Sequence, residues 1–158
     1  ADVTAVYAAQ DSGAVVYCSG VNFPDTQAAS ADANTLDDYE EGTWTPSTVG
    51  FGGETINYAV YTKIGRLVHF SCQITTDGTS DASHFVVRGL PFTVGTASAG
   101  SIQHSGNYSG EDGMVNVHIQ ASTTDVVLYE SDASDMTYDM MGFNSAGIYV
   151  RISGTYNV

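Results

Sequence analysis

The sequence predicts an all-β fold, an antiparallel β-sandwich of jelly-roll type with about eight strands. Short runs of alternating apolar and polar residues recur over residues 43–158, and Gly, Asp, Ser and Asn separate them, as they do where turns join strands. No long amphipathic helical pattern interrupts these runs, which argues against strands and helices alternating around a parallel sheet. A small closed β-barrel is the alternative, because one sequence does not determine the order of the strands.

The clearest strand is predicted at residues 67–75. Val68, Phe70, Cys72 and Ile74 alternate there with mostly polar residues. Successive side chains of a strand point to opposite faces, so this pattern indicates an antiparallel strand with one buried face. The same alternation predicts strands at residues 58–64, 115–121 and 148–158, and shorter strands at residues 43–49, 84–88, 97–104 and 126–130.

The last of these runs extends to the final residue of the sequence. Ile148, Val150 and Ile152 share one parity, whereas Tyr149 and Arg151 have the other. A terminal segment with this pattern is expected to be tied into a sheet. We therefore expect Ile148, Val150 and Ile152 to act as packing or interface anchors.

Two regions are predicted, a connector over residues 1–42 and a β-sandwich head domain over residues 43–158. Residues 1–31 are rich in Ala, Val, Ser and Asp, and so short a segment is expected to pack on the head domain or on neighbouring copies. Thr35, Asp38 and Gly42 match the signals that begin and end a helical turn. Residues 35–41 are therefore predicted to form such a turn, with an extended linker as the alternative.

Acidic and aromatic residues crowd the end of this connector. The acids at positions 37, 38, 40 and 41 are expected to face solvent or a helix N-terminus, where negative charge is favourable. Tyr39 and Trp44 are large amphipathic rings in the same region. We expect both to be packing or interface anchors that hold the connector on the head domain, with direct contact to a ligand as the alternative.

The charge balance restricts the partners. The chain has 158 residues, of which 18 are acidic and 4 are Lys or Arg, for a net charge of −14. Nucleic acid is disfavoured as a partner, because phosphate binding needs clustered Lys and Arg. Membrane insertion is not expected, because no stretch approaches the ~18 apolar residues of a spanning helix.

No cofactor is expected, although Ca²⁺ binding is an open alternative to solvated loop acids. Three acids lie close in sequence without forming an EF-hand pattern; they are Asp132, Asp135 and Asp139. The two cysteines do not make a disulfide framework. Cys72 is expected to be a buried small side chain of its strand, and its pairing with Cys18 is left open.

Three motifs occur in a fixed order along the first part of the chain. They are DANTLDDYEEGTWTP at residues 32–46, YTKIGR at residues 61–66 and RGLPF at residues 88–92. In this order they resemble the C-terminal domain of tailed-bacteriophage tail fibres and related virion appendages. The resemblance implies a virion protein that forms a homotrimer, meets other virion proteins through its N-terminal segment and attaches to a glycan or protein receptor on the bacterial surface.

Two other functions are weighed against receptor attachment. One is a structural virion protein, such as a head fibre, a decoration subunit or a joining module, and the other is a polysaccharide depolymerase fragment. No nucleophile motif or phosphate-binding loop is present, so we expect no enzyme. A glycosidase pair stays open, because carboxylates occur at residues 111–112 and 130–135.

A glycan site needs an exposed aromatic ring beside planar polar groups. Binding residues are usually placed on loops over a rigid scaffold. Tyr108 and Tyr138 each lie in a turn-rich stretch, with Asn107 and Asp112 near the first of them. These four residues are the predicted receptor-binding site.

Overall fold

A computed structural model describes residues 22–23, 36, 38–50, 53–77, 85–105, 108–109, 114–131, 138–140, 142–143 and 146–158. These residues form twelve β-strands and no helix, and every strand pair is antiparallel, so the predicted all-β class is confirmed. The strands are β1 Tyr39–Thr43, β2 Ser47–Val49, β3 Glu54–Ile64, β4 Leu67–Thr76, β5 Phe85–Arg88, β6 Ser98–His104, β7 Tyr108–Ser109, β8 Met114–Ile119, β9 Val126–Ser131, β10 Tyr138–Met140, β11 Gly142–Phe143 and β12 Tyr149–Asn157.

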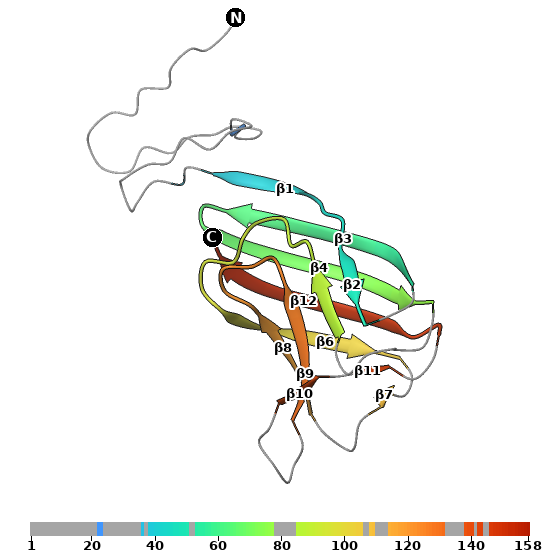
Figure 1. Ribbon diagram of the computed structural model, residues 1–158. Helices are drawn as coiled ribbons and strands as arrows, with labels where there is room; N and C mark the ends of the chain where they lie inside the picture. The colour runs from blue at the N-terminus through green and yellow to red at the C-terminus, as the bar shows by residue number, and fades with distance from the viewer. Residues whose placement is uncertain are drawn as a thin grey trace, which may run out of the picture.

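Nine strands follow one another in a single sheet, in the order β1-β3-β4-β12-β6-β8-β9-β5-β2 (Figure 1). Strand β10 pairs with β9, and β7 pairs with β11 in a separate ribbon. Strands β1 and β2 lie at opposite ends of this order, yet only residues 44–46 separate them in the chain. Four Cα steps span at most about 14 Å. The sheet must therefore curl until its two edges approach, which combines the facing layers of a sandwich with the continuity of a barrel.

The core lies inside this curl. Along β4, the side chains of Val68, Phe70, Cys72 and Ile74 have no exposed area, as their alternation predicted. The neighbouring strand β12 places Val150 and Ile152 in the same core, and Ile148 is buried just before it. These three residues are packing anchors within the chain. The Cys72 thiol is free, and burial raises its pKa to about 12.

The helical turn predicted at residues 35–41 is wrong where the structure describes it. Residues 39–43 form β1, which pairs with β3 from Tyr39 opposite Ile64 to Thr43 opposite Val60. The sheet supplies backbone hydrogen bonds that a single helical turn would lack, so strand pairing overrides the local capping signals. Strand β1 also crosses the boundary predicted between residues 42 and 43.

Candidate functional site

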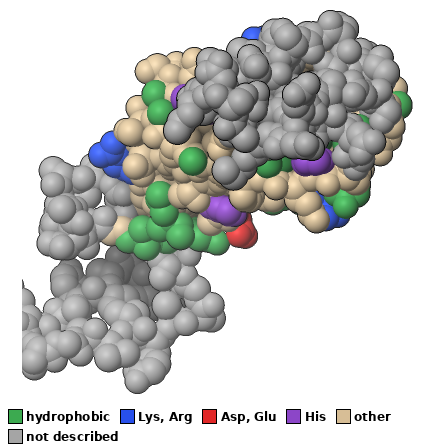
Figure 2. Space-filling model, turned by 90° about the horizontal axis from the view of Figure 1, so that it is seen from below, with side chains coloured by type: hydrophobic (Ala, Val, Ile, Leu, Met, Phe, Trp, Pro, Cys, Tyr) green, Lys and Arg blue, Asp and Glu red, His purple; other side chains and the backbone are tan. Residues whose placement is uncertain are grey.

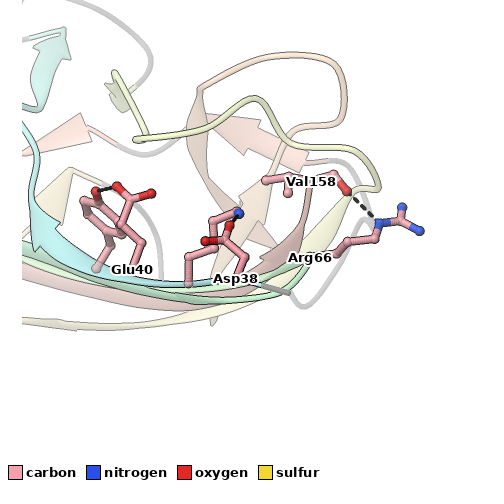
Figure 3. Close-up of polar contacts among 6 residues, drawn as sticks. Asp38, Glu40, Arg66 and Val158 are labelled. Atoms are coloured by element: carbon pink, nitrogen blue, oxygen red, sulfur yellow. Dashed lines mark hydrogen bonds and ion pairs between the residues drawn. The ribbon is translucent and has the colours of Figure 1, made fainter. Parts of the chain in front are cut away.

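The three sequence motifs meet at one end of the β3–β4 hairpin. Asp38 is buried, not solvated as predicted, because its carboxylate pairs with the buried Lys63 (Figure 3). The backbone is fastened at the same place, where Gly65 N donates to Asp38 O at 2.9 Å. Glu40 accepts a hydrogen bond from the Tyr61 hydroxyl, and this bond raises the pKa of Tyr61 to about 12.

The third motif packs against this pair of contacts. The Phe92 ring meets the Tyr61 ring edge to face, with centroids 5.5 Å apart, and lies 5.4 Å from Lys63 Nζ. The Tyr156 hydroxyl donates to Phe92 O at 3.1 Å, which ties the motif to the last strand. Together these contacts make the motifs a structural junction that holds β1 on the curled sheet.

The two aromatic anchors predicted at this junction differ in their placement. Trp44 is 9% exposed and meets Phe70 edge to face, with centroids 6.2 Å apart, so it is a core anchor. Tyr39 remains 43% exposed and is therefore not a buried anchor within one chain. Strand alternation explains the difference, because Glu40 and Gly42 oppose the inward residues of β3 and Tyr39 has the outward parity.

Tyr39 belongs to a group of exposed apolar side chains on the outer face of the sheet. We call this group the apolar stripe; its members are 39–48% exposed and comprise Tyr39, Tyr58, Val60, Ile64 and Leu67. Pairing makes them neighbours, because Ile64 lies opposite both Tyr39 and Leu67. Figure 2 shows hydrophobic side chains gathered on part of the described surface, with one acidic patch beside them.

The apolar stripe continues into a polar area, which we call the polar platform. It comprises the outward side chains Gln73 of β4, Tyr149 and Arg151 of β12, and Gln103 of β6. Tyr58 lies opposite Gln73 and joins the two areas. Over strands β1, β3, β4, β12 and β6, the outward positions carry a single acid, Glu41, whose carboxylate accepts a hydrogen bond from Tyr39 at 3.0 Å. In a chain of net charge −14, this face is poor in acids.

A groove of about 680 Å³ opens beyond the platform, over β6, β8 and β9. It forms where β6 is lined by small residues and pairs with β8 only over residues 98–100. The His118 and Tyr129 rings lie on its wall, with centroids 5.9 Å apart. Its described lining contains no Asp, Glu, Lys or Arg and comprises residues 97–100, 115–118 and 129. The volume of this groove lies within the range of small-molecule sites in proteins.

The predicted receptor-binding residues fall on short strands or outside the described residues. Tyr108 lies in β7 opposite Phe143, and Tyr138 lies in β10 opposite Ser131, so the two are in different strand pairs. Asn107 and Asp112 lie outside the described residues.

The structure describes only some of the residues that were predicted as candidates for Ca²⁺ binding, glycosidase chemistry or disulfide pairing. Asp139 lies in β10 opposite Glu130, whereas Asp132, Asp135, Cys18 and residues 111–112 are outside the described part of the chain. Among the described residues, no group of three or more His, Cys, Asp or Glu side chains is placed to hold a metal ion. Within the same residues, no helix is long and apolar enough to cross a membrane.

Sequence reasoning missed the polar platform and the buried partner of Asp38. Alternation over residues 58–64 favours the parity of Val60 and Ile64 as inward, but the structure leaves these two side chains 43% and 47% exposed and buries Lys63 instead. Arg151 was assigned to the outward parity of its strand, but its partners come from two other strands. Comparisons of the chain with protein-family models, with curated proteins and with solved structures return no match.

Proposed function

We propose that this chain is a non-enzymatic module of a bacteriophage fibre or related virion appendage. The module assembles as a homotrimer and attaches the particle to a receptor on the bacterial surface, for which a glycan is the leading candidate. The apolar stripe is the observation that carries the proposal. The order of the three motifs adds the virion context through their resemblance to tail-fibre domains.

The stripe supports association because of its composition and its position. Monomeric soluble proteins rarely expose large contiguous apolar patches, and such patches commonly mark interaction sites. Three copies would carry a large negative charge, so contacts between copies must avoid acidic side chains. The stripe meets this requirement, since Glu41 is the one acid among the outward positions of its strands.

The motif junction suits a module that is pulled through its connector. Residues before β1 lead to the rest of the virion in this proposal, and β1 is held by the Asp38–Lys63 pair and the Glu40–Tyr61 hydrogen bond. Load on the connector is thereby passed to β3, in the interior of the sheet order. The groove and the polar platform then offer receptor contacts, and three copies raise the avidity of a weak site without new contacts.

Native mass measurement tests the assembly. We expect about three times the chain mass of 16.6 kDa. Replacing Ile64→Thr and Leu67→Thr together should release single chains, because both replacements make the stripe polar. The matched control Ile64→Val with Leu67→Met keeps the same positions apolar and should keep the assembly. A folded wild-type chain that stays at 16.6 kDa would contradict the proposal.

Binding to whole cells separates attachment from the other virion roles. Labelled protein is incubated with a panel of bacterial strains, and phage adsorption to the strains that bind is measured with and without an excess of the protein. Competition supports attachment, whereas an assembled protein that binds no strain favours a head fibre, decoration or joining module. Release of reducing sugar from the bound polymer would instead indicate a depolymerase.

A further inference from the structure

We propose that Arg151 anchors a binding site for a carboxylate or phosphate group carried by a surface saccharide. The inference rests on the proposed attachment function and names the chemical class of its receptor. It concerns the polar platform and is independent of the apolar stripe.

Arg151 differs from the two basic side chains that have an acidic partner. Lys63 pairs with Asp38, and Arg88 Nε lies 3.5 Å from Asp125 Oδ2. The remaining base, Arg66, donates from Nε to the backbone O of Val158 at 3.0 Å. Among the residues that the structure describes, Arg151 contacts neutral groups alone. An unpaired cation is unexpected where acids outnumber Lys and Arg by 18 to 4.

The guanidinium of Arg151 is held in place from three sides. Arg151 lies directly opposite Gln73 in β4 and Gln103 in β6. Its Nε donates to Gln73 Oε1 at 2.7 Å, its Nη1 donates to Gln103 Oε1 at 3.0 Å, and its Cζ lies 4.8 Å from the centre of the Tyr149 ring. A side chain fixed in this way loses little rotamer freedom when a ligand binds.

These contacts leave hydrogen-bond donors on the surface. A guanidinium has five N–H donors, and a Gln side chain has one acceptor oxygen and one NH₂ group. Both Gln oxygens accept from Arg151, so their NH₂ groups and the remaining guanidinium N–H groups are what the platform presents. A row of donors around a positive charge is complementary to a group that only accepts, such as a carboxylate or a phosphate.

The surroundings favour such a group on a sugar. No outward position of β4, β12 or β6 carries an acid that would compete for the guanidinium. The Ser101 and Ser153 hydroxyl oxygens lie 2.9 Å apart in the next row of the sheet, and Tyr58 lies on the other side of Gln73. Hydroxyl groups and an exposed ring beside an anion site are suited to the hydroxyls and the face of a pyranose ring.

Titration of the ¹⁵N-labelled chain of 158 residues with monosaccharides tests the site directly. Galacturonate supplies a carboxylate, glucose 6-phosphate supplies a phosphate, and galactose is the neutral match of the first. We expect at least one acidic sugar to shift the Nε–H signal of Arg151, assigned by its loss in Arg151→Lys, and galactose to leave it unchanged at equal concentration. The two acidic sugars distinguish a carboxylated from a phosphorylated receptor.

Two variants with the same change of charge provide the control. Arg151→Gln should weaken binding of the acidic sugar by about 10- to 100-fold, the range for lost hydrogen bonds to a charged group. Arg88→Gln also removes one positive charge, but at a site with its own acidic partner, and should leave the affinity within about twofold.

The inference is overturned if galactose shifts the Arg151 signal as strongly as the acidic sugars, if no acidic sugar shifts it, or if the two variants weaken binding equally. A change of native mass in Arg151→Gln without any sugar binding would place the guanidinium in a contact between copies and would also overturn it. Cell binding that Arg151→Gln leaves intact would refute this site and leave attachment standing, whereas wild-type protein that binds no strain would refute attachment itself.

Discussion

The inner and outer faces of β3, β4 and β12 arise from alternate residues of the same strands, but their chemistry differs. The inner face is close-packed and apolar along β4 and β12, and the one basic residue on it, Lys63, is neutralised by Asp38. The outer face combines an exposed apolar stripe with an exposed Arg151 that has neutral partners among the described residues. The inner face therefore accounts for the fold, and the outer face for the contacts proposed with other molecules.

The basic residues Lys63 and Arg151 show the contrast between the two faces. Burial of an ammonium is unfavourable unless a carboxylate compensates it, and Lys63 has that compensation at 4% exposure. Arg151 remains in water, so nothing in the fold requires an acid beside it.

Deletion of residues 147–158 should abolish folding. Strand β12 lies between β4 and β6 and supplies Val150, Ile152 and Tyr156 to the core. The end of the segment is also fastened, since Val158 N donates to Arg66 O at 3.0 Å (Figure 3 shows the neighbouring bond from Arg66 to Val158). Loss of the cooperative thermal transition and of near-ultraviolet circular dichroism is expected. A truncated protein with unchanged melting and size would show that the inner face is built without β12.

Breaking the buried ion pair should have the next largest effect. Lys63→Met leaves the Asp38 carboxylate buried without a partner, and such changes lower the free energy of unfolding by about 3–5 kcal/mol. The double replacement Lys63→Met with Asp38→Leu removes both charges and should recover most of this loss. Urea denaturation at fixed protein concentration measures both values. A single variant as stable as the wild type would mean that solvent reaches Asp38.

Sequence patterning identified β4 and β12 and their inward residues, because the alternation of a strand depends on neighbours two positions apart in the chain. It did not identify β1 as a strand or Asp38 as buried, since both depend on β3, and Lys63 lies 25 positions from Asp38. The polar platform was not predicted either, because it also depends on residues that are far apart in the chain. Gln73 and Gln103 lie 78 and 48 positions from Arg151, and only the sheet order makes them its neighbours.

Alkaline pH should destabilise the protein through three groups. Burial raises the pKa of the Cys72 thiol from 9.0 to about 12 and the pKa of the Tyr156 phenol from 10.0 to about 12. The hydrogen bond to Glu40 raises the pKa of the Tyr61 phenol from 10.0 to about 12. A folded-state pKa above the unfolded value gives stability that is present below the unfolded value and is lost as pH rises towards the folded value. The melting temperature should therefore fall between about pH 9 and pH 12.

The replacement Cys72→Ala separates the thiol from the phenols. It removes the group with the lowest unfolded pKa, so the fall in melting temperature should begin near pH 10 in place of pH 9. Its stability at pH 7 serves as the reference for the small cavity that the replacement leaves. An onset that does not move would show that the buried thiol contributes nothing to the alkaline transition.

The smallest effect on the stability of a single chain is expected on the outer face. Ile64→Thr changes a side chain that is 47% exposed, and surface replacements usually stay within about 0.5 kcal/mol. The inner-face counterpart Ile152→Thr, at 1% exposure, should lower the free energy of unfolding several times more, because it buries a hydroxyl and leaves a cavity.

Association between copies provides a second measurement on the same variant. The melting temperature of an assembling protein rises with its concentration, so the wild type should show this rise over a hundredfold range and Ile64→Thr should show less of it. If Ile64→Thr keeps the full concentration dependence, copies meet through another surface, and the apolar stripe loses the role assigned to it.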